Sequence, residues 1–347
     1  MRPRSGAEAV AISAAAFLVS LTVFGAFVAL RGLNPFEVCR AVFAGAFGSW
    51  FAIEYTFTQA APLMLTGLCT AIPARAGMLV IGGEGALVVG GVATALAGVM
   101  LAGLPAPLGI PIVCLAGAGA GGLWIGAAGA LRQWRGVNET IATLLLNYIA
   151  IAVMNHLVSG PIRDFSQVLK PASWPIPEQL RVGDMPGMSV HWGLAAGTAV
   201  CLLAWILMRK TTFGFAVDIL GGSLRAAQLA GLPIARIVLT TTVLAGAAAG
   251  LAGAFEVIAV HGFASASLAV GFGYTGILVA FLARQNPLGV VFVSILLGGI
   301  SASGGLLQRH FGLPDAATLV LRGILFVVVL ASNTLYGRFK VFQGLAV

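Results

Sequence analysis

Residues 86–104 read ALVVGGVATALAGVMLAGL, nineteen consecutive positions without a charged side chain, and Gly82-Gly-Glu-Gly85 stands directly before them. A membrane-spanning helix needs about 20 predominantly apolar residues. Further apolar runs with almost no charge occur at 9–30, 141–153 and 288–300. These runs are apolar on every face instead of alternating, so they predict helices and not the strands of a barrel. The fold class is therefore all-α, a polytopic bundle of membrane helices.

The composition of the whole chain agrees with a membrane protein. Of its 347 residues, 59% are hydrophobic and 9% are charged, whereas soluble domains carry roughly a quarter charged residues. This excludes a soluble enzyme. The net charge of +8 would suggest nucleic acid in a soluble protein, but membrane proteins gather Lys and Arg on the cytoplasmic side. We therefore expect a lipid bilayer, and no nucleic acid, as the partner of this charge.

Catalytic and metal-binding patterns are missing from the sequence. The four histidines are dispersed, without a His-Glu-x-x-His spacing, and neither a nucleophile motif nor a phosphate-binding glycine loop occurs. The four cysteines lie singly in or beside apolar runs, as small packed residues do. We expect no catalytic residue, no metal site and no cofactor.

We expect a single transmembrane domain over residues 1–347, with about ten spans. They are 9–30, 50–72, 77–102, 109–131, 139–159, 191–208, 235–259, 270–283, 287–305 and 317–334. Ten crossings put both termini on one side. With that side cytoplasmic, inner segments hold 12 Lys and Arg and outer segments hold 6, which favours cytoplasmic termini. The longest outer loop is 160–190, expected as an ordered or semi-ordered cap outside the membrane, and the longest inner loop is 209–236.

Glycine is abundant, and much of it lies inside the spans. The chain has 47 glycines, with clusters at 117–122 and 246–253. Small residues let membrane helices approach closely. Packing is therefore the expected role of these clusters.

Two other glycine clusters resemble one another, Gly82–Gly85 and Gly271–Gly276. Downstream of them come Pro-Leu-Gly, at 107–109 and 287–289, and Gly-Gly-Leu, at 121–123 and 304–306. In the expected topology the third span runs outward and the eighth inward, so the halves would be inverted copies, as in many alternating-access transporters. A chance echo in a glycine-rich sequence is the alternative.

Glu84 lies deep in the membrane in this topology. It follows Arg75 by nine residues, or about 13 Å if that stretch is helical. An acid inside a membrane is costly unless it is paired, so it is a functional hypothesis by default. The alternative is a structural carboxylate that accepts backbone N–H groups at a broken helix. Glu256 raises the same question, but it lies near an outer helix end, where we expect water to solvate it.

Two other segments carry polar signals. Asn138-Glu139-Thr140 precedes an apolar run and predicts a helix N-cap. Asn147 and Tyr148, two turns further on, are candidates to line a polar cavity, although hydrogen bonding between helices explains them equally well. In the inner loop, Ser223–Pro233 predicts a short helix with a glycine stop, either a docking element or an ordinary connector.

Six motifs in this order resemble the permease subunits of ATP-binding-cassette importers, in the nucleoside and simple-sugar branch that is related to ribose and branched-chain amino acid permeases. They are Ile81–Gly85, Val137–Tyr148, Thr212–Phe215, Arg225–Gly231, Gly271–Ile277 and Asn286–Gly289. The resemblance implies a multi-pass protein of the cell inner membrane that works with a second permease subunit, an ATP-binding subunit and a substrate-binding protein. ATP hydrolysis would then occur in the partner, and this chain would not be an enzyme.

The resemblance also assigns residues. It implies that the ATP-binding subunit docks on the inner loop around Leu224, Arg225, Ala226, Ala227 and Gly231. It supports Glu84, Asn147 and Tyr274 as substrate-pathway residues, to which we add Tyr148 and Thr275. Relatives often have Asn where Val80 stands and Asp where Thr275 stands, so this pathway carries fewer polar groups.

The sequence hypothesis is an importer permease for a nucleoside-like or sugar-like solute, driven by a partner ATPase. The alternative is an ion-coupled secondary transporter, which would also use an inverted repeat and Glu84 but has no need of a docking helix. An intramembrane enzyme is disfavoured because no catalytic acid pair or His cluster is recognisable.

Overall fold

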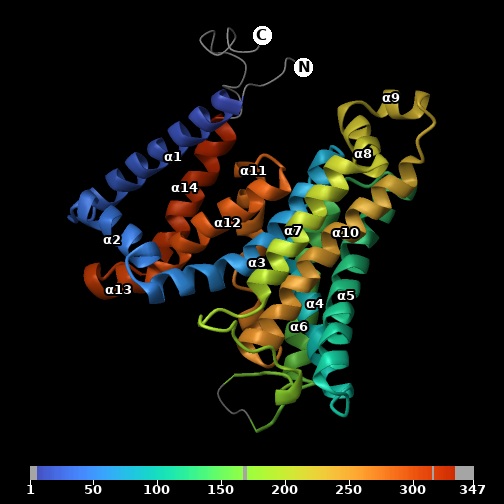
Figure 1. Ribbon diagram of the computed structural model, residues 1–347, viewed down its shortest axis with the longest axis horizontal. Helices are drawn as coiled ribbons and strands as arrows, with labels where there is room; N and C mark the ends of the chain where they lie inside the picture. Colours follow the sequence, from blue (N-terminus) through green and yellow to red (C-terminus); the bar gives the residue numbers. More distant parts are fainter. Residues whose placement is uncertain (1–5, 167–169, 315, 333–347) are drawn as a thin grey trace. The chain divides into compact units, whose positions relative to one another are not determined.

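The computed structural model describes residues 6–166, 170–314 and 316–332, and its chain divides into two compact units (Figure 1). The first unit comprises residues 1–59 with 296–347, and the second comprises 60–295. All regular elements among the described residues are helices, accompanied by three isolated β-bridges. The predicted all-α class is confirmed.

The second unit holds most of the helices. Its elements are the later part of α3 (Trp50–Arg75), α4 (Gly83–Met100), α5 (Ala106–Arg135), α6 (Glu139–Ser159), η1 (Glu178–Leu180), α7 (Gly193–Lys210), α8 (Thr212–Gly222), α9 (Leu224–Leu229), α10 (Ile234–Phe255), the π-helical turn η2 (Glu256–His261), η3 (Ala266–Leu268), α11 (Phe272–Leu282) and the start of α12 (Pro287–Ala302). Within it, α10 packs against α4 and α5, and α4 also packs against α6.

The first unit is built from both ends of the chain. It contains α1 (Gly6–Ala29), α2 (Pro35–Phe47), the beginning of α3, the end of α12, α13 (Gly304–Phe311) and α14 (Ala316–Ser332). Helix α1 packs against α14, and α2 packs against α13. Asn34 caps α2 by accepting a hydrogen bond from the backbone N–H of Phe36, at 3.0 Å.

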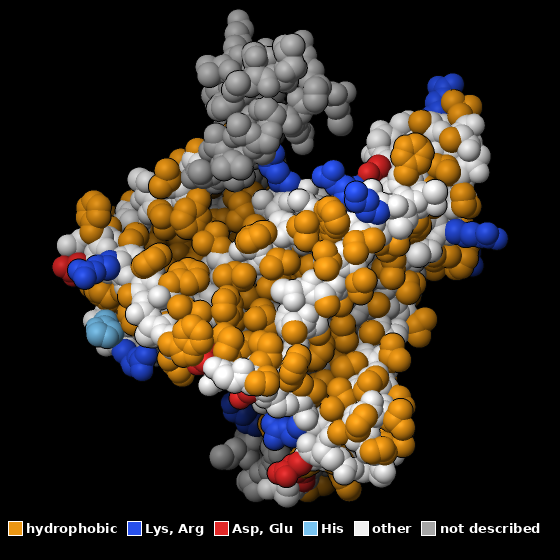
Figure 2. Space-filling model, viewed as in Figure 1, with side chains coloured by type: hydrophobic (Ala, Val, Ile, Leu, Met, Phe, Trp, Pro, Cys, Tyr) orange, Lys and Arg blue, Asp and Glu red, His pale blue; other side chains and the backbone are white. Residues whose placement is uncertain are grey.

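The surface of the helices suits a bilayer. Large hydrophobic side chains are exposed along most helices, and in Figure 2 they cover much of the face drawn, where Lys and Arg are few. By length and composition, 6 of the described helices can cross a membrane, or up to 7 if the bent pair α2 and α3 is one span. The chain is therefore a multi-pass membrane protein.

The expected number of about ten spans is not confirmed. Three of the expected spans coincide with short apolar helices, at Ala15–Ala29, Ala266–Leu282 and Ala316–Ser332, whereas α2 and α3 meet at an angle of 79°. The reason is local: hydropathy shows that a segment is apolar but not where its helix breaks. At Gly271, for instance, the left-handed φ of +94° begins α11 part-way along the apolar run.

Helices α4, α5 and α10 approach one another through glycines. A Cβ at Gly121 of α5 would lie 2.6 Å from the Cα of Gly250 in α10, and a Cβ at Gly117 would lie 3.0 Å from the carbonyl oxygen of Gly90 in α4. These distances leave no room for a side chain, because the neighbour is backbone and cannot rotate away. The predicted packing role of both glycine clusters is confirmed.

The segment that links α6 to α7 packs back on this bundle. Ile176 and Leu180 are buried in a hydrophobic cluster with residues of α4 and η2, and the Ser173 hydroxyl accepts a hydrogen bond from the backbone N–H of Ala264, at 2.9 Å. His191, which precedes α7, is also buried, and this burial lowers the pKa of its imidazole. The neutral ring accepts a hydrogen bond at Nδ1 from the backbone N–H of Gly193, at 3.1 Å.

The glycine contacts predict a position-specific loss of stability. We expect Gly121→Ala to lower the free energy of unfolding by about 1–3 kcal/mol, the usual cost of overpacking, because its methyl group meets the backbone of Gly250. The control is Gly119→Ala in the same helix, where a Cβ meets nothing within 4 Å. Thermal unfolding of the purified variants in detergent measures both. Equal melting temperatures would show that α5 and α10 are not in contact at Gly121.

Candidate functional site

The chain between α3 and α4, residues 76–82, is not helical although most of it is buried. In a membrane such backbone must find hydrogen-bond partners within the protein. The N–H of Leu79 donates to Glu139 Oε1, at 3.3 Å, and its carbonyl accepts from the Thr140 hydroxyl, at 3.0 Å. The N–H of Ile81 donates to Thr143 Oγ1, at 3.2 Å. Side chains of helix α6 thus provide hydrogen-bond partners for several of the backbone N–H and C=O groups of this extended segment.

The spacing of the polar residues in α6 explains how one helix does this. Thr140, Thr143 and Asn147 are three and four residues apart, so they lie on one face of the helix. Asn147 continues the series, because its Oδ1 accepts a hydrogen bond from the N–H of Gly85 at the start of α4. A Cβ at Gly85 would lie 2.8 Å from the Cα of Asn147, so only glycine allows this approach.

Glu84 joins the starts of two helices. Its Oε1 accepts a hydrogen bond from the N–H of Gly271, at 2.7 Å, and its Oε2 accepts one from Gly273, at 2.5 Å. The first N–H groups of a helix lack intrahelical acceptors and carry partial positive charge, so a carboxylate complements the start of α11. Glu84 is only 1% exposed. This geometry is that of the structural carboxylate at a broken helix, one of the two alternatives that the sequence left open.

The other predicted pathway residues gather beside Glu84. Asn147 Nδ2 donates to the Tyr274 hydroxyl, and the Thr275 hydroxyl donates to the carbonyl of Gly271, at 3.0 Å. Asn147 and Thr275 are buried, whereas Tyr274 is 41% exposed and Tyr148 is 61% exposed. The two tyrosines lie near enough to interact electrostatically. They are the members of this group that present an accessible surface.

Sequence reasoning missed part of this network. Glu139 was expected only as part of the N-cap motif Asn138-Glu139-Thr140, but it also accepts a hydrogen bond from the N–H of Leu79 and forms an ion pair with Arg132. Thr70 and Thr66 of α3 were not expected either. The hydroxyl of Thr70 donates to the carbonyl of Val80, at 3.1 Å, and that of Thr66 to the carbonyl of Phe272, at 3.1 Å. The signal was present: small hydroxyl residues at helical spacing beside a glycine-rich break.

The expectation for Glu256 is wrong. The residue is buried because α10 continues into the π-helical turn η2, which is covered by the hydrophobic cluster around Val257 and Ile258. Its partner is His261 of the same turn, with 3.7 Å between Nε2 and Oε2.

The inner segment 209–236 contains two helices where the sequence predicted one. Helix α8 begins after Thr211, whose hydroxyl accepts a hydrogen bond from Gly214 N–H. The predicted short helix is present as α9, where the Ser223 hydroxyl accepts from the N–H of Ala226, at 3.3 Å. Gly231 follows α9 with a left-handed φ of +67°, as a glycine stop requires.

The surface of α9 is exposed and partly apolar. Leu224 is 55% exposed and Leu229 is 83% exposed, and Arg225 and Ala226 are exposed between them. Ala227, by contrast, is completely buried. It anchors α9 to the rest of the chain, and the other predicted coupling residues remain at the surface.

Comparison with known proteins places this architecture in a family. Residues 52–330 match the family described as "branched-chain amino acid transport system / permease component". The chain belongs to this permease family. The match includes the whole of the second unit, and therefore the extended segment, the Glu84 contacts and α9.

Individual relatives match this permease over most of both chains. The guanosine ABC transporter permease protein NupP of Bacillus subtilis is 30% identical over 322 residues, 91% of this chain and 92% of the relative. The glucose ABC transporter permease protein TsgB13 of Haloferax volcanii is 29% identical over 344 residues, 93% and 87% of the two chains. The nucleoside ABC transporter permease protein NupB of Lactococcus lactis is 26% identical over 321 residues, 88% and 87%. The resemblance read from the motifs is confirmed, and these relatives give no support to an ion-coupled transporter.

The hydrogen bonds of Asn147 predict an energetic coupling. Asn147→Ala leaves the buried N–H of Gly85 without its acceptor, at a cost of about 1–3 kcal/mol of unfolding free energy. Tyr274→Phe removes one hydrogen bond and costs about 0.5–1.5 kcal/mol. The double variant should lose less than the sum, because both changes break the same bond.

Unfolding in detergent, monitored by tryptophan fluorescence, measures all three permease variants. The control is Tyr148→Phe, which removes a hydroxyl from the exposed neighbour of Asn147 and should change stability by less than about 0.5 kcal/mol. Strict additivity of Asn147→Ala and Tyr274→Phe would contradict the shared bond.

Proposed function

We propose that this chain is the membrane-spanning subunit of an ATP-binding-cassette importer, with residues 1–347 acting as one permease domain. ATP is hydrolysed in a partner subunit that docks on α9, and a second permease subunit completes the translocation path. The observation that carries this proposal is α9 itself: a capped, anchored helix that exposes two leucines and an arginine.

The geometry of α9 suits docking of a protein partner. Ser223 and Gly231 fix its two ends, and buried Ala227 fixes its inner face. Its outer face combines apolar side chains with a positive charge, which are the features of an interface core and its rim. An ordinary connector gains nothing from exposed leucines, since their transfer to water is unfavourable.

The orientation follows from charge. Arg75, Arg209, Lys210, Arg225 and Arg236 belong to the α8–α9 region and the helix ends beside it. Lys and Arg are concentrated in cytoplasmic segments, so we place α9 and both termini in the cytoplasm, with the protein in the inner membrane. The segment 160–190 then faces outward, where a substrate-binding protein delivers the solute.

The solute is nucleoside-like or sugar-like. Support comes from the names of the relatives, which are guanosine, nucleoside and glucose permeases, and from the exposed rings of Tyr148 and Tyr274. Aromatic rings stack on nucleobases and on other flat or apolar faces. Asn147 donates a hydrogen bond to Tyr274, and Glu84 and Thr275 bond the start of α11, which carries Tyr274.

Copurification tests the docking role of α9. The chain carries a C-terminal tag, is extracted from native membranes in mild detergent, and its partners are identified by mass spectrometry. We expect a nucleotide-binding subunit with the unaltered chain and little or none with Leu224→Asp/Leu229→Asp, because a charge at each exposed leucine disrupts an apolar contact. The control is Gln228→Ala, an exposed polar position in the same helix, which should retain the partner.

If the unaltered chain is recovered alone, and transports solute into liposomes without any ATPase, it is not a subunit of an ATP-driven importer.

A transport measurement tests the tyrosines. We expect Tyr148→Ala to raise the KM for uptake of a radiolabelled nucleoside about tenfold or more, because stacking on an aromatic ring contributes about 1–3 kcal/mol. The control is Ile149→Ala, the exposed residue next to it in α6. If both variants raise the KM equally, or if neither variant changes it, Tyr148 does not contact the solute.

A further inference from the structure

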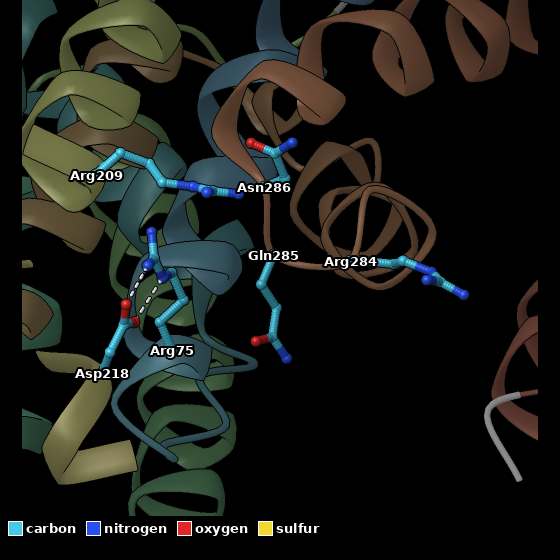
Figure 3. Close-up of a pocket in the computed structure, with 6 residues that line it drawn as sticks. All are labelled: Arg75, Arg209, Asp218, Arg284, Gln285 and Asn286. Atoms are coloured by element: carbon cyan, nitrogen blue, oxygen red, sulfur yellow. Dashed lines mark hydrogen bonds and ion pairs between the residues drawn. The ribbon is translucent and has the colours of Figure 1, made fainter. Parts of the chain in front are cut away.

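A polar recess opens at one end of the second unit, apart from the hydrogen-bond network around Glu84 and from the surface of α9. It has a volume of about 390 Å³ and is lined by Arg75, Arg209, Asp218, Arg284, Gln285 and Asn286 (Figure 3). These residues come from the end of α3, the end of α7, the middle of α8 and the turn between α11 and α12. No apolar side chain is among them, so the recess suits a polar or charged ligand.

The charge of the recess is unbalanced. Two guanidinium groups, those of Arg75 and Arg209, lie on the side of the recess that holds one carboxylate, that of Asp218, whereas the side chain of Arg284 points away from them (Figure 3). Arg75 engages this carboxylate: its Nε donates to Oδ1, at 3.0 Å, and its Nη2 to Oδ2, at 2.6 Å. The third guanidinium nitrogen of Arg75 points away from Asp218, toward the side chain of Arg209 (Figure 3). Arg209 itself is exposed and has no ion-pair partner in the part of the chain that the structure describes. Positive charge thus exceeds what Asp218 neutralises.

The turn between α11 and α12 adds uncharged donors. Asn286 Oδ1 accepts a hydrogen bond from the N–H of Leu288, at 3.3 Å, which leaves its amide nitrogen for a ligand. Arg284 and Gln285 have φ values of +53° and +59°, a left-handed conformation that non-glycine residues rarely adopt. Such conformations are concentrated at binding sites and active sites. Here the turn brings the amide side chains of Gln285 and Asn286 to the recess, beside the positive end of α12.

The packing of α8 on α3 makes this arrangement rigid. Gly221 of α8 lies against the end of α3, where a Cβ would come within 3.2 Å of the carbonyl carbon of Ala76. Asp218, three residues earlier on the same helix, is thereby held opposite Arg75. The ion pair therefore orients one guanidinium for the ligand and does not merely neutralise it.

The location of the recess points to the nature of the ligand. Arg75 ends α3, Arg209 lies in the last turn of α7, and Asn286 directly precedes α12, so the recess lies where apolar helices end and lipid headgroups begin. Guanidinium groups bind phosphate through paired, charge-assisted hydrogen bonds, and basic pockets between membrane helices recognise anionic headgroups.

We propose that this recess is a phosphate-binding site, in which Arg209 and Arg75 supply guanidinium donors and Gln285 and Asn286 supply amide donors. The phosphate group belongs either to the headgroup of an anionic phospholipid or to a soluble phosphate compound. The proposal does not rest on the docking role of α9, because Leu224 and Leu229 take no part in the recess.

Binding to the purified full-length chain tests the proposal. The probes are phosphatidylglycerol, diacylglycerol with the same acyl chains but no phosphate, and inorganic phosphate. Native mass spectrometry counts bound lipid, and the melting temperature in detergent reports binding of each probe. We expect phosphatidylglycerol to bind and stabilise the chain, diacylglycerol to do neither, and added salt to weaken the effect because charges are screened.

Variants connect the binding to the recess. Arg209→Gln should weaken phosphatidylglycerol binding about tenfold, as expected for loss of a charge-assisted hydrogen bond, and Arg209→Lys should have a smaller effect because it keeps the charge but loses the planar donor pair. The control is Lys210→Gln, which removes the adjacent charge outside the recess. Its affinity should stay within about twofold of the unaltered chain, as for a screened surface charge.

The binding results distinguish a lipid headgroup from a soluble phosphate compound. Binding of phosphatidylglycerol that Arg209→Gln weakens and Lys210→Gln spares supports a lipid headgroup site. Binding of inorganic phosphate with the same dependence on Arg209, without lipid binding, supports a site for a soluble phosphate compound. Binding of neither probe, or binding that both variants weaken equally, overturns the proposal.

Discussion

The second unit depends on a single requirement, that the buried non-helical backbone before α4 finds partners without water. In a membrane every unpaired N–H or C=O group is costly. Helix α6 supplies Glu139, Thr140 and Thr143 to residues 79 and 81, and α3 supplies Thr70 to residue 80. The sequence of α6 therefore has to combine an apolar surface toward lipid with a polar face at helical spacing. The same requirement explains why Gly82 and Gly85 stand at this break, because a side chain at either position would collide with the backbone of α6.

A consequence of the break is that two helices begin inside the bundle. Both α4 and α11 present their positive ends to the carboxylate of Glu84, which lies in the first turn of α4 and bonds the first N–H groups of α11. One buried charge thus stabilises both starts. Tyr274, in the first turn of α11, is held at the surface by Asn147 as a result. The residues that support the helix starts are consequently neighbours of the tyrosines that are exposed at the surface.

How far the sequence predicts this arrangement depends on the range of the interactions. Local signals were sufficient for the apolar helices, the cap at Asn138, the glycine packing of α5 against α10, and α9 between Ser223 and Gly231. They were insufficient where the partner is distant: Glu84 and Gly271 are 187 residues apart, and no local pattern shows that one carboxylate serves both helices. The expected number of about ten spans is not confirmed for a related reason, since α11 begins at a backbone break within an apolar run. The burial of Glu256 likewise arises from packing around η2.

Helix α3 connects α8, which leads into α9, with the hydrogen bonds around Glu84. At its end, Arg75 holds Asp218 of α8, which leads through Ser223 into α9. One to three turns earlier, Thr70 and Thr66 bond the carbonyls of Val80 and Phe272, beside Glu84 and Tyr274. Under the proposed docking of a partner on α9, this helix and a small set of hydrogen bonds would link α9 to the starts of α4 and α11. Rigid helices and hydrogen-bond networks of this kind can carry coupling between distant sites, and in the proposed importer this connection would join ATP hydrolysis outside the membrane to the solute path within it.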